Sequence, residues 1–200
     1  IEDENFSLQR IDDGTPVFYT IYNQGSSITI GANKMYPGGT LGLNVTGQGL
    51  TAGVWDGGKV RDTHVEFAGN KVILSDATVN LSTHSTHVTG TIIATGVSAL
   101  RKGIAYQADA KTYDYDNDSL EMLAFADEGY LVSNHSYGYV ATNLPTAKFG
   151  SYDTQSIQFD NLANAYPYYQ IVKAAGNDRN DFNITQVNIK GGYDLLTGGS

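Results

Sequence analysis

The sequence contains no cysteine, only four prolines, and no apolar run long enough to span a membrane. Without cysteine the chain forms no disulfides, so its stability has to come from a packed core. Basic residues are also few, since 12 lysines and arginines stand against 21 acidic residues, and they form no block. We therefore expect neither a nucleic-acid partner nor a membrane partner.

The rest of the composition is that of a globular protein. The 200 residues are 40% hydrophobic and 16% charged, which is enough for one domain with a substantial core. The chain is acidic, with a net charge of −9, and rich in tyrosine and glycine, and we interpret this as typical of a secreted protein. Residues 1–48 indicate turns and short strands, such as "PVFYTIY", and form an N-terminal entry segment; residues 49–200 form the main unit.

From residue 49 onward, short apolar runs end in small polar residues. Continuous apolar runs bounded by turns are typical of buried parallel strands. Amphipathic segments separate most of these runs, and alternating strands and helices predict a doubly wound, mostly parallel α/β sheet with helices on both faces. The predicted strands are "LTAGVW" from Leu50, "AKTYDY" from Ala110, "YLVSNHS" from Tyr130 and "YQIVKAA" from Tyr169.

Two of the connecting segments carry helix signals. In "DSLEMLAFADEG", Asp118 is the expected N-cap and Glu121 completes a capping box. The expected apolar set of this helix is Leu120, Leu123, Ala124, Met122 and Phe125. "DTQSIQFDNLANAYP" has a helical apolar stripe that ends before Pro167.

In a doubly wound sheet, catalytic and ligand-binding residues lie at the carboxyl ends of the strands. Three polar residues stand at the predicted strand ends, namely Asp56, Ser136 and Asn177. "STHSTHVTG" opens a further helix with His84 and His87. Each residue taken alone fits a turn or a structural role, but an acid, a histidine and an asparagine in this order favour a common site.

These segments resemble the subtilisin-like serine proteases. "GLTAGVWDGGKVRDTHVEF" is similar to that family's segment around the catalytic aspartate, and "HSTHVTGTI" to its histidine helix. "GIAYQADAKTYDY" is similar to the segment after that helix, "NHSYG" to a wall of the substrate cleft, and "VKAAGN" to the strand before the oxyanion asparagine. The resemblance covers about residues 48–178 and implies an endopeptidase with an Asp-His-Ser triad, acting on peptide or protein substrates.

The resemblance assigns a role to each matching residue. His84 is the general base and Asp56 is the acid that orients it, so the two side chains should lie within hydrogen-bond reach. His87 is expected outside this pair, with its ring packed against the end of the sheet. Asn177 would donate its amide to the oxyanion. Ser136 and Gly138 would form one wall of the substrate site; this wall would offer backbone groups to an extended peptide.

The sequence departs from the family pattern near these residues. Ser85 follows the first histidine where the family has glycine, and Gly57 follows the aspartate where the family has a hydroxyl residue. Glu66 stands where the family often has an acidic calcium ligand, but the short loop "TGVSALRKG" lacks the calcium-holding insert. We expect no required cofactor and no metal site, with a structural calcium ion as the weaker alternative.

The motif of the catalytic serine does not occur in these 200 residues. We therefore expect a companion segment, beyond residue 200 or on a second chain, to supply the serine, and this chain alone to be inactive and structurally incomplete. Two alternatives stay open. One is a non-catalytic, subtilase-like binding module. The other is a zinc site in which His84 and His87, three residues apart on a helix, join Asp56 or His64.

Overall fold

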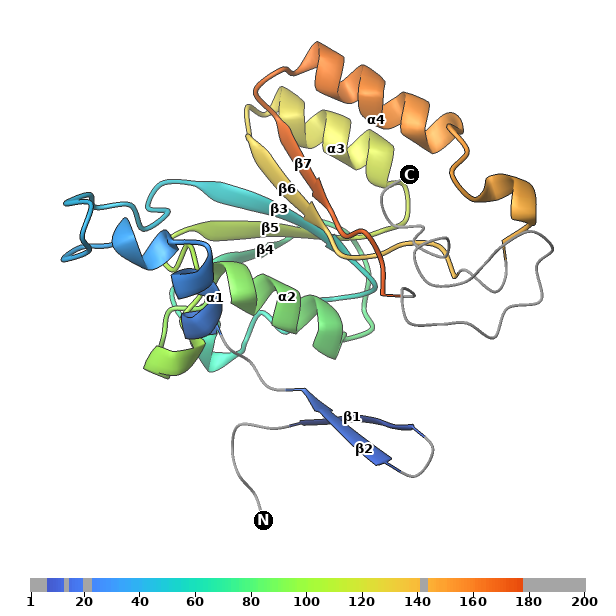
Figure 1. Ribbon diagram of the computed structural model, residues 1–200. Helices are drawn as coiled ribbons and strands as arrows, with labels where there is room; N and C mark the ends of the chain where they lie inside the picture. The colour runs from blue at the N-terminus through green and yellow to red at the C-terminus, as the bar shows by residue number, and fades with distance from the viewer. Residues whose placement is uncertain (1–6, 13–14, 20–22, 141–143, 178–200) are drawn as a thin grey trace.

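The computed structural model describes residues 7–12, 15–19, 23–140 and 144–177, and its centre is a five-stranded parallel sheet. The strands lie in the order β4-β5-β3-β6-β7, with helices on both faces (Figure 1). The sheet is formed by β3 (Thr51–Asp56), β4 (Val72–Leu74), β5 (Asp109–Asp114), β6 (Val132–His135) and β7 (Gln170–Lys173). The α/β fold predicted from the sequence is confirmed.

The four predicted strands correspond to β3, β5, β6 and β7. β3 and β5 keep the predicted length but are shifted by one residue, whereas β6 and β7 are each three residues shorter than predicted. The sequence pattern did not reveal β4, because its three residues are too few to establish a periodicity. The register is parallel throughout, and residue 55 of the central strand β3 pairs with residue 113 of β5 and residue 135 of β6. The carboxyl ends of β5, β3, β6 and β7 therefore share one edge.

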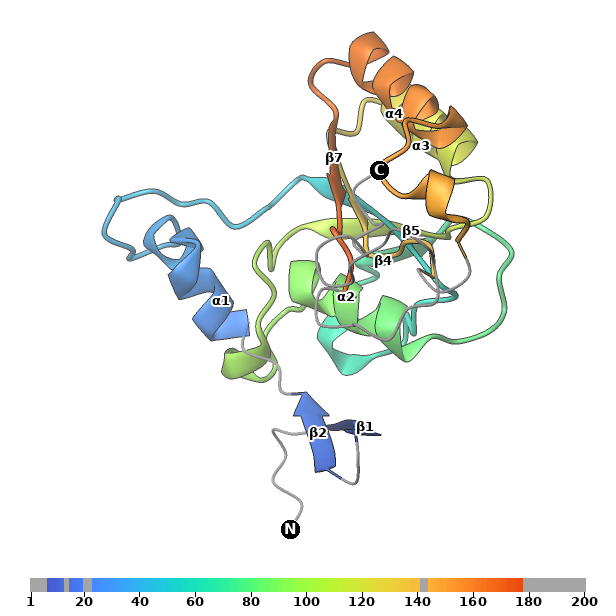
Figure 2. The same ribbon diagram turned by 45° about the vertical axis from the view of Figure 1, so that its right-hand side comes forward.

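Neighbouring residues of β3 pack into two separate hydrophobic cores, because side chains alternate between the faces of a strand. Val54 is fully buried on the face covered by helix α2 (Thr83–Ile93). Its cluster also contains Val60, Phe67, Ile93, Ala108 and Ala110. Trp55 is buried on the opposite face, under α3 (Asp118–Asp127) and α4 (Thr154–Ala165). The turned view shows these two helices on the side of the sheet away from α2 (Figure 2).

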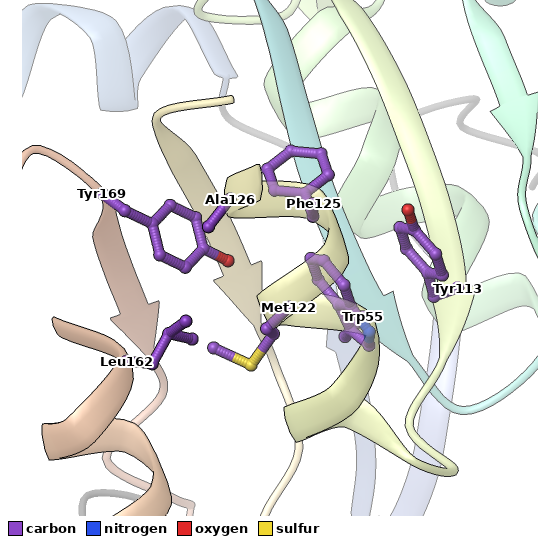
Figure 3. Packing of buried hydrophobic residues seen from close by; sticks show 7 residues of the cluster. All are labelled: Trp55, Tyr113, Met122, Phe125, Ala126, Leu162 and Tyr169. Carbon is purple, nitrogen blue, oxygen red and sulfur yellow. The ribbon is translucent and has the colours of Figure 1, made fainter. Parts of the chain in front are cut away.

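The core around Trp55 is mainly aromatic (Figure 3). Tyr113 lies flat against the indole, with ring centroids 4.3 Å apart, and Phe125 of α3 meets it edge-on at 5.5 Å. Met122, also on α3, is fully buried beside them. Ala126, Leu162 and Tyr169 complete the cluster. This packing fixes the last residues of β3. It therefore sets the direction in which the Asp56 side chain leaves the sheet.

Helix α3 begins differently from the prediction. Its N-cap is Asn117, which has a left-handed backbone with φ 61 and makes no side-chain cap bond, whereas Asp118 is already helical. The Asp118 carboxylate is buried and accepts a 2.6 Å hydrogen bond from the Tyr137 hydroxyl, so it is drawn inward. The expected apolar set is right for Met122 and Phe125, which are buried, and wrong for Leu120 and Leu123, which are 70% and 42% exposed.

The N-terminal segment contains more than the predicted turns and short strands. An antiparallel hairpin of β1 (Ser7–Asp12) and β2 (Thr15–Tyr19) stands apart from the parallel sheet in Figure 1. Helix α1 (Asn23–Thr29) follows, which the sequence did not predict. Throughout the described residues, every helix is too short or too polar to cross a membrane.

Candidate active site

The candidate site lies at the edge where the parallel strands end. Asp56 is the last residue of β3, and Ser136 directly follows β6. Trp55 pairs with His135 in register, so the next residues along each strand, Asp56 and Ser136, leave the sheet side by side. The sequence placed both residues correctly at strand ends, because the apolar runs before them fix where each strand stops.

Asp56 and His84 form a close pair. His84 Nδ1 lies 2.7 Å from Asp56 Oδ1, and the His84 side chain is 61% exposed while that of Asp56 is only 4% exposed. A buried carboxylate that accepts from Nδ1–H leaves the imidazole with Nε2 free to accept a proton. The structure thus brings together the two residues expected to pair. The Asp56 carboxylate is buried, and the His84 imidazole is open to a reactant.

Asp56 is held by two further donors on the same oxygen. The Gly57 amide donates to Oδ1 at 2.7 Å, and the Ser85 hydroxyl donates to it at 3.0 Å. Asp56 Oδ2 is buried and has no hydrogen-bond partner among the described residues. The Ser85 contact was not predicted. The only signal for it was the hydroxyl that replaces glycine beside His84, and the sequence pattern gave no partner for that hydroxyl.

Helix α2 positions His84 in its first turn. Ser82 is the N-cap, and its hydroxyl accepts from the Ser85 amide at 3.1 Å. Thr89 and Ile93 are fully buried against the sheet, two and three turns along the helix. Because the helix start is capped and its inner face is packed, the His84 backbone is fixed relative to β3.

His87 does not pack against the end of the sheet, so that expectation is wrong. Its side chain is exposed and lines a cavity of about 440 Å³ together with Phe67 and Gly90. Three residues turn a helix by about 300°, which places His87 on the helix face next to that of His84. Partial burial, with a smaller contribution from His84, lowers the pKa of His87.

Ser136 and Gly138 lie where a substrate wall was expected. The Ser136 hydroxyl accepts from Asn134 Nδ2 at 2.9 Å, and Gly138 is exposed. Gly138 lines a cavity of about 350 Å³ whose other walls are mainly aromatic. The remaining lining residues are Tyr115, Tyr137, Tyr139, Val140, Gln155 and Lys173. A pocket with aromatic walls beside an exposed backbone is suited to holding a side chain of an extended peptide.

Asn177 is exposed and follows the end of β7 by four residues. Since β7 pairs with β6, the segment that carries Asn177 leaves the sheet at the same edge as Ser136. This agrees with the expected position of Asn177 along the chain. No distance between its amide and His84 follows from this placement, so the oxyanion role stays a prediction.

A buried polar chain lies beneath the wall residues. Tyr169 donates to Ser133 at 2.7 Å, and Ser133 Oγ lies 2.8 Å from His135 Nε2. His135 Nδ1 lies 3.0 Å from the Tyr137 hydroxyl, which donates to Asp118. Burial, and to a lesser degree Lys173, lowers the pKa of His135 to about 4 against the opposing effect of Asp118. His135 is therefore neutral at physiological pH. Sequence reasoning did not identify this chain.

Glu66 is buried and its carboxylate is occupied by the loop that follows α2. Oε2 accepts from the amides of Gly96 and Val97 at 2.7 and 3.0 Å, and Oε1 accepts from the amide of Ser98 at 3.0 Å. Burial raises the pKa of Glu66, but these hydrogen bonds, with one from Thr95, outweigh it and lower the pKa overall. The oxygens a calcium ion would need are already used by N–H donors.

The described residues contain no group of three His, Cys, Asp or Glu side chains that could hold a metal ion. His84 directs Nδ1 to Asp56, while His87 lines the cavity beside Phe67 and Gly90. The zinc alternative therefore gains no support from this part of the chain. Residues 178–200, which include Ser200, lie outside the described residues.

Similarity to known proteins was found at the level of structure. No family model matches the sequence, and no curated protein matches it. The chain is similar to the prenylagaramide maturation protease PagA, with 24% identity and a TM-score of 0.51 over 65% of this chain and 47% of that chain. It is also similar to the self-cleaved protease domain of PatA, with 22% identity and a TM-score of 0.51 over 66% of this chain and 52% of that chain.

The chain thus spans about half the length of each of these two structures. At these identities the similarity establishes the fold and not the activity. The five-stranded parallel sheet with helices on both faces matches the structures of subtilisin-like proteases.

Proposed function

We propose that the chain is the N-terminal part of a secreted, subtilisin-like serine endopeptidase. The observation that carries this proposal is the 2.7 Å contact between His84 Nδ1 and the buried Asp56, at the carboxyl edge of a parallel sheet. His84 takes the proton of a serine hydroxyl at Nε2 and passes it to the leaving amine, while Asp56 stabilises the imidazolium. Asn177 donates to the oxyanion, and the peptide lies along Ser136 and Gly138.

The serine comes from a companion segment, either beyond residue 200 or on a second chain. The similar structures are about twice as long as the part matched here, which supports a missing half. In the described part of the sheet, β7 pairs with β6 on one side and with no strand on the other. Further strands of the same domain would pair with this open side of β7. No cofactor is required for this chemistry.

The proposal is tested on the full-length protein with a peptide substrate. A serine-directed covalent inhibitor should abolish hydrolysis, a chelator should leave it intact, and His84→Ala should reduce it to background. His87→Ala is the matched control, because this histidine lies on the same helix and lines a separate cavity with Phe67 and Gly90. Hydrolysis that resists the serine-directed reagent and survives His84→Ala would refute the proposal, and a full-length protein that binds peptides without cleaving them would favour the non-catalytic module.

A further inference from the structure

Ser85 makes a contact that the ordinary role of a helical hydroxyl does not explain. Serine and threonine side chains inside a helix commonly bond back to a carbonyl one turn earlier. Thr86 does so with Ser82 O at 2.7 Å, and Thr91 does so with His87 O at 3.1 Å. Ser85, which is only 1% exposed, instead donates across to Asp56 Oδ1 at 3.0 Å. Its hydroxyl is therefore directed at the carboxylate that pairs with His84.

The backbone of Ser85 is fixed independently of this contact. Its amide donates to the Ser82 hydroxyl at 3.1 Å, which caps the helix. Consequently the Ser85 side chain is presented to Asp56 from a rigid position, one residue after His84. The two donors from helix α2 converge on the same carboxylate oxygen from adjacent residues.

A hydroxyl could not reach Asp56 as easily from the strand side. A Cβ added to Gly57 would lie 3.0 Å from Tyr115 Cε1 and 3.6 Å from the Tyr115 hydroxyl. Gly57 has no positive φ, so space and not backbone conformation favours glycine here. The Tyr115 ring packs against Tyr137 with centroids 5.4 Å apart, and both rings line the aromatic cavity next to Gly138. A side chain at position 57 would therefore require the exposed Tyr115 ring to shift by a few tenths of an ångström.

We propose that Ser85 is a positioning residue, which holds the Asp56 carboxylate so that Oδ1 faces His84. This inference rests on the proposed function, because it concerns the orientation of the same acid and base. Asp56 Oδ2 has no partner among the described residues, so only the donors on Oδ1 set the rotation of the carboxylate. Without Ser85, His84 Nδ1 and the Gly57 amide are the donors left on Oδ1. The carboxylate then turns more freely, and the imidazole loses its fixed direction.

The test compares Ser85→Ala with wild type in the full-length protease. We expect kcat to fall about 10- to 100-fold, the effect of losing one hydrogen bond to a charged group, with KM within about twofold. The rate of covalent inactivation by a serine-directed reagent should fall by the same factor as kcat, because that reaction needs the acid and base but no peptide wall. Ser85→Cys, which keeps the shape but donates weakly, should behave like Ser85→Ala and covers the case in which alanine impairs folding.

Thr89→Val is the matched control, since Thr89 is fully buried on the same helix and its hydroxyl has no partner among the described residues. It should leave kcat and the inactivation rate unchanged. An unchanged kcat in both Ser85 variants would overturn the positioning role, and so would equal losses in Ser85→Ala and Thr89→Val. Failure of the proposed function looks different, because His84→Ala would then be as active as wild type whatever happens at position 85.

Discussion

The imidazole of His135 lies almost parallel to the indole of Trp55, with ring centroids 5.1 Å apart and 16° between the planes. The opposite face of Trp55 stacks on Tyr113 at 4.3 Å. The three rings come from neighbouring strands at one level of the sheet. Because Asp56 directly follows Trp55, this stack fixes the point from which the carboxylate reaches His84.

The buried His135 predicts a loss of stability in acid. Its pKa is about 4 in the folded protein, against 6.5 as the ordinary value. The unfolded chain therefore binds more protons between these pH values, so the free energy of unfolding falls as the pH drops from 7 to 4. The contribution of this one group is about 3 kcal/mol. Urea unfolding followed across this pH range measures it.

His135→Gln is the comparison for this measurement, since glutamine keeps a donor and an acceptor but does not titrate. The variant should be less stable at pH 7 and should lose less stability on acidification than wild type. Equal slopes of unfolding free energy against pH in the two proteins would show that His135 does not carry the effect.

The clamp formed by Glu66 predicts that the loop after α2 is held without a metal. Glu66 binds the amides of Gly96, Val97 and Ser98, while the buried Lys71 ammonium donates to the carbonyl oxygens of Ile93 and Tyr106. Glu66→Gln should lower the free energy of unfolding by about 1–3 kcal/mol, because a neutral amide accepts these bonds weakly and brings its own donors. Thermal unfolding of the two proteins compares them.

The pH dependence of this contribution has a defined sign. The pKa of Glu66 lies below the ordinary 4.5, so its stabilisation is complete above that value and is lost as the pH falls through the lowered pKa. A chelator should leave the unfolding midpoint unchanged. A midpoint that drops with chelator and recovers with calcium would mean that a metal ion, and not Glu66 alone, holds the loop.

The sequence predicted those parts of the molecule that local pattern controls. The apolar runs located four of the five strands, and the polar residues after them located the carboxyl edge. The pairing of Asp56 with His84 followed from the family motifs around each residue. Each of these features depends on a short stretch of chain, so it could be inferred without knowing how distant stretches pack.

The features that were missed depend on contacts between distant segments. The partner of Ser85 is set by where α2 meets β3, and the donors of Glu66 come from a loop about 30 residues further along the chain. The inward turn of Asp118 depends on Tyr137, which reaches it from the segment just after β6. No local pattern records such partners, because the same residues would serve as helix caps or surface groups in another packing.

The burial of residues along helix α3 leads to a prediction about the stability of the fold. Met122 is fully buried under Trp55, whereas Leu120 is 70% exposed two residues earlier. Met122→Ala should lower the free energy of unfolding by about 2–5 kcal/mol, because it leaves a cavity in the aromatic core. Leu120→Ala is the matched control and should change it by less than about 0.5 kcal/mol. Similar losses in both variants would contradict the packing of α3 described here.

The last prediction concerns Asn177, whose role depends on charge that exists only in the transition state. In the full-length protease, Asn177→Ala should lower kcat by about 10²–10³ while KM changes little, since the substrate carbonyl carries no full negative charge before attack. Asn177→Asp keeps the size but removes the amide donor and adds a negative charge beside the oxyanion. It should be at least as impaired in kcat. A loss shared equally between kcat and KM in the alanine variant would place Asn177 in ground-state peptide binding and remove it from the oxyanion site.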